Sequence, residues 1–259
     1  MTRPTEIDRA HAAMEAAPAD DAARLRFYAV LADAELLLLL EDEPADETLS
    51  PLILPLEEGR FVMAFDTEER LAEFTGAVAP YAALPGRVIA AQLAGQGVGL
   101  GLNLGVAPSA FLMPPGAVDW LTGMLAQGPV AAEAAPADFM APDLPHGLRH
   151  ALADKIARLP GQAAHVLVAE HGGGWLLAFV DAVPGAEPAL AKAVSEALAF
   201  SGLEEGVLDV TFLAGGDPRH AALARVALAL PVPAPAQETA QVLRVEASGM
   251  DPARPPRLK

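Results

Sequence analysis

The chain has 259 residues, with 34 acidic against 17 basic side chains, a net charge of −17 and no cysteine. The lack of cysteine excludes disulfide bonds, thiolate chemistry and Cys-based zinc or iron–sulfur sites. The acidic balance, with no visible basic patch, argues against nucleic acid and anionic membranes as partners. The length fits one large domain or two of about 120 to 130 residues.

The N-terminal residues lack the apolar core of a signal peptide. The apolar run Leu36–Leu40 is far too short to span a membrane, and its place after a predicted helix indicates a buried central strand. We therefore expect a soluble, cytoplasmic protein.

Helices are expected from Thr5 to about Ala16 and again from Asp20 or Asp21, where apolar residues recur at helical spacing. Apolar runs at Pro51–Leu56 and Arg60–Phe65 flank a short loop with glycine and predict a β-hairpin.

Asp66, with Glu69 three residues later, is expected to cap the next helix. Tyr81–Gly86 is expected to be an irregular crossing, and a helix containing Val88, Ile89 and Leu93 follows it.

The segment Gly99–Pro115 predicts a strand, a tight turn at Gly105, a short apolar strand and a helix that begins at the prolines. The leucines of the first strand would be buried, and its glycines would let another element, most simply a helix, lie close. The third glycine of a dinucleotide-binding loop is missing. Asn103 either caps the turn or faces a ligand, and the pattern favours the turn.

Pro and Ala recur without a period in 128–145, as is typical of a linker. After it the chain predicts a helix, a hairpin, a second helix, an alternating strand and a short helix, while Val226–Leu230 is either more helix or a last strand. The fold class is α+β: two sandwich-type domains with mixed or antiparallel sheets covered by helices. The expected limits are a first domain at 1–127, a linker at 128–145, a second domain at 146–232 and a loose Pro-rich tail at 233–259.

Two groups of residues in the sequence could carry catalytic or metal chemistry, and in both a structural role is favoured. His146 and His150 share a helix face but lack the glutamate of the zinc-protease motif, so no metal is expected there. Glu170 and His171 could form an acid/base pair, although a polar hairpin tip is favoured. The chain is therefore expected to be no enzyme and to need no cofactor.

Five segments carry a resemblance to a known family: Glu35–Leu40, Phe65–Leu71, Tyr81–Arg87, Gly101–Gly105 and Pro108–Pro114. Together they resemble the N-terminal domain of the SseB family over roughly residues 20–127, and the second half resembles the family's C-terminal domain more loosely. The resemblance implies a cytoplasmic bacterial protein without established catalytic activity. The family is named for an enhanced-serine-sensitivity phenotype, which suggests a link to amino-acid sensitivity.

Three functional hypotheses remain. The leading one is a non-catalytic interaction or regulatory module with an unknown protein partner, in which Phe111, Leu112 and Met113 either bind the partner or belong to the core. The second is a sensor of a small molecule, such as an amino acid, with a site between the domains or near Arg87 and Asn103. The Arg87 guanidinium suits a carboxylate, either of a ligand or of a nearby acidic residue. The third is an enzyme of unrecognised type using Glu170 and His171.

Overall fold

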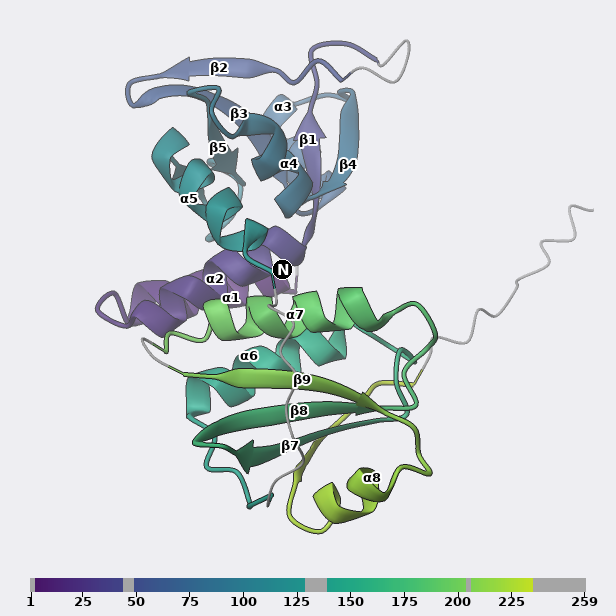
Figure 1. Ribbon diagram of the computed structural model, residues 1–259. Helices are drawn as coiled ribbons and strands as arrows, with labels where there is room; N and C mark the ends of the chain where they lie inside the picture. The colour runs from purple at the N-terminus through teal and green to yellow at the C-terminus, as the bar shows by residue number, and fades with distance from the viewer. Residues whose placement is uncertain (1–2, 44–48, 129–138, 204–205, 235–259) are drawn as a thin grey trace, which may run out of the picture.

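The computed structural model describes residues 3–43, 49–128, 139–203 and 206–234. Within these ranges the chain forms two β-sheets, each packed against helices, which confirms the α+β class (Figure 1). We call residues 3–128 the first half and residues 139–234 the second half. No helix in the described ranges combines the length and hydrophobicity needed to cross a membrane.

The first half contains helices and strands with these bounds: α1 (Glu6–Ala16), α2 (Asp21–Asp33), β1 (Glu35–Leu39), β2 (Ile53–Leu56), β3 (Gly59–Phe65), α3 (Glu68–Thr75), β4 (Tyr81–Pro85), α4 (Gly86–Leu93), β5 (Gly99–Leu102), β6 (Phe111–Met113) and α5 (Pro115–Ala126). Its strand order is β4-β1-β3-β5-β6, and β2 also pairs with β3. Only the β3–β5 pair is parallel among these. Helices α1, α2, α4 and α5 cover one face of this sheet, and α3 covers the other.

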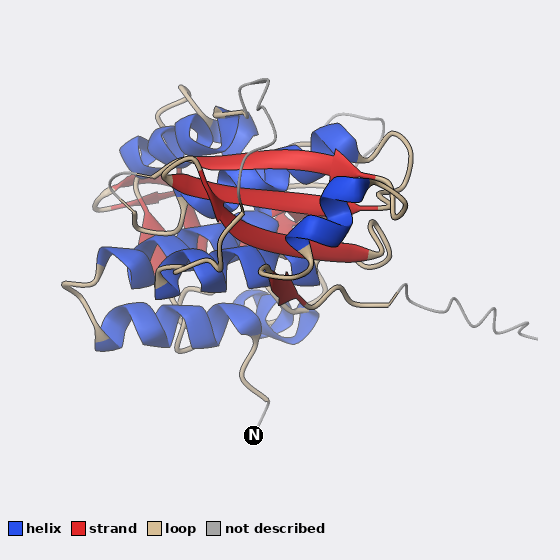
Figure 2. Cartoon of the chain, turned by 60° about the horizontal axis from the view of Figure 1, so that its bottom comes forward, coloured by secondary structure: helices blue, strands red, loops and turns tan. Residues whose placement is uncertain are grey.

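The second half contains α6 (His146–Ala157), β7 (His165–His171), β8 (Gly174–Val180), α7 (Glu187–Ala199), β9 (Leu208–Leu213), α8 (Pro218–Leu223) and β10 (Leu228–Leu230). Its strand order is β10-β7-β8-β9, with β8 and β9 parallel. Helices α6 and α7 pack on one face of this sheet and α8 on the other. Figure 2 shows α8 in front of the strands and the longer helices behind them.

The two halves meet through helices. In Figure 1, α1 and α2 lie between the first sheet and the pair α6 and α7. Phe200, which follows α7, is 2% exposed and belongs to the hydrophobic core of the first half. Its ring lies 6.5 Å from that of Trp120, edge to face. The halves are therefore joined by contacts between buried apolar side chains. The domain limits at 127 and 146 stay a prediction.

Most predicted elements are confirmed, including the β2–β3 and β7–β8 hairpins and the helices that begin after Thr5 and Asp20. Of Val226–Leu230, the last three residues form a strand, β10, as one of the two alternatives predicted. The predicted linker and tail fall largely outside the described residues.

Two local predictions in the first half are wrong. Tyr81–Pro85 is strand β4, which pairs with β1 at the sheet edge, where a proline is tolerated because one side of the strand needs no hydrogen bond. Thr67, not Asp66, caps α3, because its hydroxyl accepts the hydrogen bond from the Arg70 amide. Asp66 is used instead in an ion pair with the Arg70 side chain.

The glycines of β5 lie against side chains of the neighbouring strand rather than against a helix, which corrects the expectation. A Cβ atom at Gly99 would lie 2.5 Å from both the Met113 carbonyl oxygen and the Phe61 ring. A Cβ atom at Gly101 would lie 2.9 Å from the Met63 side chain. Because Phe61 pairs with Gly99 in the parallel register, glycine leaves the room that the large ring needs.

We expect Gly99→Ala to destabilise the protein by about 1–3 kcal/mol, because the added methyl group would overlap a backbone oxygen and a buried ring. The matched control is Gly123→Ala in α5, where the methyl group meets no atom within 4 Å. That control should be more stable by about 0.5–1 kcal/mol, since alanine favours the helix. Urea unfolding measures both, and equal effects would contradict the packing argument.

Candidate functional site

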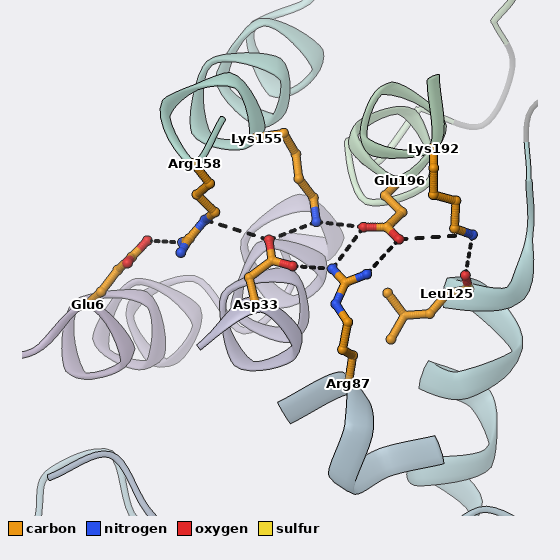
Figure 3. A network of polar contacts seen from close by, with 8 residues as sticks. All are labelled: Glu6, Asp33, Arg87, Leu125, Lys155, Arg158, Lys192 and Glu196. Carbon is orange, nitrogen blue, oxygen red and sulfur yellow. Dashed lines mark hydrogen bonds and ion pairs between the residues drawn. The ribbon is translucent and has the colours of Figure 1, made fainter. Parts of the chain in front are cut away.

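Four charged side chains from four helices meet where the halves join, and we call them the ion cluster: Asp33, Arg87, Lys155 and Glu196 (Figure 3). The Arg87 guanidinium donates to both carboxylate oxygens of Glu196, at 2.9 and 3.0 Å, and also to Asp33. Lys155 Nζ donates to Asp33 Oδ2 at 2.7 Å and to Glu196 Oε2 at 2.8 Å. Two residues of each half thus form one closed network.

The close approach of α4 to α2 makes this network possible. A Cβ atom at Gly86 would overlap the Leu31 carbonyl oxygen, so only glycine lets α4 begin against the end of α2. The Gly86 amide donates to the Ala34 carbonyl. Arg87 and Asp33 are thereby held side by side within the first half.

The ion cluster is buried at its centre and exposed at its margin. The side chain of Glu196 is 3% exposed, and those of Asp33 and Lys155 are each 10% exposed. At the margin, Arg158 pairs with Glu6 and lies 3.6 Å from Asp33 Oδ2. Lys192 also links the halves, because its ammonium donates to the carbonyl oxygens of Leu125 and Gln127.

Burial alone would raise the pKa of Glu196, but hydrogen bonds from Arg87 and Lys155 outweigh it and lower that pKa. For Arg87, burial alone would lower the pKa, and the carboxylates of Glu196 and Asp33 raise it. Both groups are therefore charged at neutral pH, so the network is a true ion-pair cluster.

A cavity of about 200 Å³ lies next to the ion cluster, between α2 and α6. Helices α1 and α7 complete its wall. Charged and imidazole side chains on the wall are Asp20, Arg26, Asp33, His146, His150, Asp154, Lys155 and Arg158. Its remaining lining is mostly alanine, with Val30, Gly147, Phe200 and Ser201, whose hydroxyl already donates to the Leu198 carbonyl oxygen. The cavity is thus built by both halves.

The two histidines predicted to share a helix face do so. The rings of His146 and His150 lie 5.5 Å apart, edge to face, on the cavity side of α6. In the part of the chain that the structure describes, no group of three or more side chains is placed to hold a metal ion.

A second polar network fixes the start of α1 to the first sheet, and we call it the Asp8 network. Asp8 accepts hydrogen bonds from Ser109 Oγ at 2.6 Å and from Arg70 Nη2 at 2.5 Å. Arg70 also donates to both oxygens of Asp66, at 2.7 and 2.8 Å. Asn103 completes it: its side chain accepts from the Asp66 amide at 3.2 Å and donates to Ser109 at 3.0 Å.

Residues 10–120 match the family model described as SseB protein N-terminal domain. This part of the chain matches the SseB N-terminal domain, as the sequence resemblance predicted. A search of curated proteins and a search of solved structures gave no match.

Four of the five segments that carry the SseB resemblance contribute residues to these two networks. Asp66, Arg70, Asn103 and Ser109 all belong to the Asp8 network, and Arg87 belongs to the ion cluster. These polar residues of the SseB domain therefore hold the domain together and hold the second half to it.

Arg87 and Asn103, which the sequence placed near one ligand, lie in different networks. Arg87 does bind a carboxylate, and that carboxylate belongs to Glu196 of the same chain. Asn103 is fully buried, has a φ of 49° and has both ends of its amide group hydrogen-bonded. Its position is that of the turn residue that the pattern favoured.

The residues weighed as a partner surface are part of the core. Met113 is fully buried, and Phe111 and Leu112 pack against the clusters on the two faces of the SseB sheet. At the hairpin of the second half, Glu170 pairs with Trp175, and the His171 ring lies 5.7 Å from that of Phe139. No hydrogen bond joins Glu170 to His171 within the described ranges.

Sequence reasoning missed Asp33, Lys155 and Glu196. Lys155 stands between Leu152 and Ile156 in an apolar helix pattern, and Glu196 stands between Val194 and Ala197. A charge inside an apolar stripe was the available signal, because a buried charge requires a partner.

We expect Glu196→Gln to destabilise the chain by about 3–5 kcal/mol, because it leaves Lys155 and Arg87 in a buried site with one carboxylate fewer. Glu15→Gln, an exposed residue on α1, makes the same charge change and should alter stability by less than about 0.5 kcal/mol. Denaturant unfolding compares them, and a small effect at Glu196 would mean that the cluster does not stabilise the joined state.

The Asp8 network predicts a pH dependence. Burial alone would raise the pKa of Asp8, but hydrogen bonds from Arg70, Ser109 and the Thr5 amide lower it from 3.8 to about 2. Its stabilising contribution is therefore complete above pH 4 and is lost as the pH falls toward 2. Asp8→Asn should cost about 2 kcal/mol at pH 7, and roughly half of that difference should remain at pH 3.

Chemical unfolding of wild type and Asp8→Asn between pH 7 and pH 3 measures this difference. Asp42→Asn, at an exposed position, is the control and should track the wild type at every pH. A gap between Asp8→Asn and wild type that stays constant down to pH 3 would contradict the assignment.

Proposed function

We propose that the protein is a non-catalytic regulatory module that binds a small molecule in the cavity between its halves. The observation that supports this proposal is the origin of the cavity wall, which comes from α1 and α2 of one half and α6 and α7 of the other. Sites between structural units are common positions for small-molecule ligands. This is the second hypothesis from the sequence, in its form with a site between the domains.

A ligand in this position contacts both halves, so its binding free energy depends on how they are arranged. A ligand shifts a conformational equilibrium only by its difference in affinity for the two states. Because the cavity exists only while α2 and α6 face each other, its ligand favours the joined arrangement. Asp33, Lys155 and Arg158 line the cavity and also belong to the ion cluster or its margin, which couples the two features.

The regulatory output would pass to a protein partner, as the leading hypothesis from the sequence expects. The packing of Phe111, Leu112 and Met113 favours a different surface for that partner. The link to amino-acid sensitivity implied by the SseB resemblance belongs to the same proposal, since a module that binds a metabolite can adjust its partner to metabolite levels.

The test is affinity purification of the tagged full-length protein at native level from its own cells, with mass spectrometry of the proteins and small molecules that it retains. Ala151→Leu places a larger side chain in the cavity wall. Ala157→Leu, on the same helix but outside the wall, is the control. We expect a stoichiometric small molecule in the wild type and the control, and its loss from Ala151→Leu.

Circular dichroism and urea unfolding of all three proteins establish that each is folded. A wild type without any retained small molecule would count against the proposal, and so would retention that Ala151→Leu leaves unchanged. A catalytic turnover of the retained molecule would overturn the non-catalytic part.

A further inference from the structure

Resting on the proposed function, we propose that the cavity binds a small organic monocarboxylate. Its apolar group, about the size of one aromatic ring, lies among the alanines. Its carboxylate is held by the imidazoles of His146 and His150 and by the Arg26 guanidinium.

The size of the cavity sets the size of the apolar group. Its volume is about 200 Å³. Apolar protein cavities of about 150 Å³ bind benzene, so one ring or a branched aliphatic chain fits here. A nucleotide or a peptide does not.

The lining sets the polarity of that group. Alanines from all four helices, Ala13, Ala22, Ala23, Ala29, Ala151 and Ala197, face the cavity together with Val30 and Phe200. These side chains offer no hydrogen bond to a ligand, so the enclosed part of the ligand must be apolar to avoid a desolvation penalty.

The acidic side chains of the wall are already engaged. The Asp20 carboxylate accepts from the Ala22 amide at 2.9 Å and caps α2. Asp33 is held by Lys155 and Arg87, and Asp154 lies 3.0 Å from the Arg26 guanidinium. A ligand ammonium group would have to share Asp33 and Asp154 with the cations that already pair with them, and Arg26, Lys155 and Arg87 would repel it.

The basic side chains, by contrast, keep capacity for an anion. Among the described residues, neither the His146 nor the His150 ring makes a hydrogen bond. Arg26 is 44% exposed and contacts Asp154 through one nitrogen, whereas a guanidinium carries five N–H donors. Exposed ion pairs of this kind contribute little to stability, so Arg26 can turn a second donor toward a ligand carboxylate.

The experiment compares three probes that share a phenyl ring and differ in the head group: phenylacetate, phenylacetamide and 2-phenylethylamine. Isothermal titration calorimetry of the full-length protein at pH 7 gives each Kd. We expect phenylacetate to bind at least about tenfold more tightly than the amide or the amine, because one charge-assisted hydrogen bond contributes an affinity difference of this size.

Two variants locate the head group. The double variant His146→Gln/His150→Gln should weaken phenylacetate binding by about tenfold and leave the binding of phenylacetamide unchanged. His165→Gln/His220→Gln removes two imidazoles that lie outside the cavity and should change neither. Unchanged phenylacetate affinity in the first double variant would overturn the assignment of the head group.

Equal or tighter binding of the amine or the amide would overturn the monocarboxylate proposal. The proposed function is judged separately, by the retained molecule and its loss in Ala151→Leu. A retained molecule that proves to be a cation or a neutral compound would leave the proposed function standing and reject this inference.

Discussion

The bidentate contact between Arg87 and Glu196 is the interaction on which the joined state of the two halves depends. Glu196 is one of the least exposed charged side chains in the described structure, and a buried carboxylate is costly unless cations surround it. Arg87 and Lys155 meet this need from opposite sides of the junction. Separation of the halves would expose Glu196 to water but would also divide the cluster, leaving Arg87 with Asp33 in one half and Lys155 with Glu196 in the other. Buried ion pairs, and not apolar contacts alone, therefore determine how the two halves fit together.

The Asp8 network fixes α1 on the sheet of the first half. It ties α1 to the β3–α3 junction and to the turn after β5, so that α1 and α2 are fixed on the sheet before they face the second half. Asp33 at the end of α2 and Arg87 at the start of α4 are then neighbours within the SseB domain itself. The Asp8 network fixes α1 on the first sheet, and the ion cluster joins α2 and α4 to the second half.

Periodicity and turn chemistry predicted the order of almost every element, because each helix and strand buries one face and its ends carry local signals. Tyr81–Pro85 was misjudged because an edge strand can end in proline, and its strand character comes from pairing with β1, which lies far away in the sequence. The site was harder to predict for the same reason. Arg87 was singled out and a carboxylate was anticipated, but Asp33 and Glu196 lie 54 and 109 residues away, and no local pattern joins them. Contacts between residues so far apart in the sequence arise only from tertiary packing.

The cavity is a space between the helices that side chains do not fill. Helices that meet through large apolar side chains fill the space between them, as the cores of both halves do. Where α2 meets α6, alanines line the space between the helices and ion pairs join them at its margin, so no large apolar side chains fill that space. An unfilled volume forgoes dispersion contacts and so lowers stability. The proposed ligand, a small apolar group with a carboxylate, would restore those contacts and find its donors at the margin, so the proposal places the response to a ligand at this junction rather than at any single side chain.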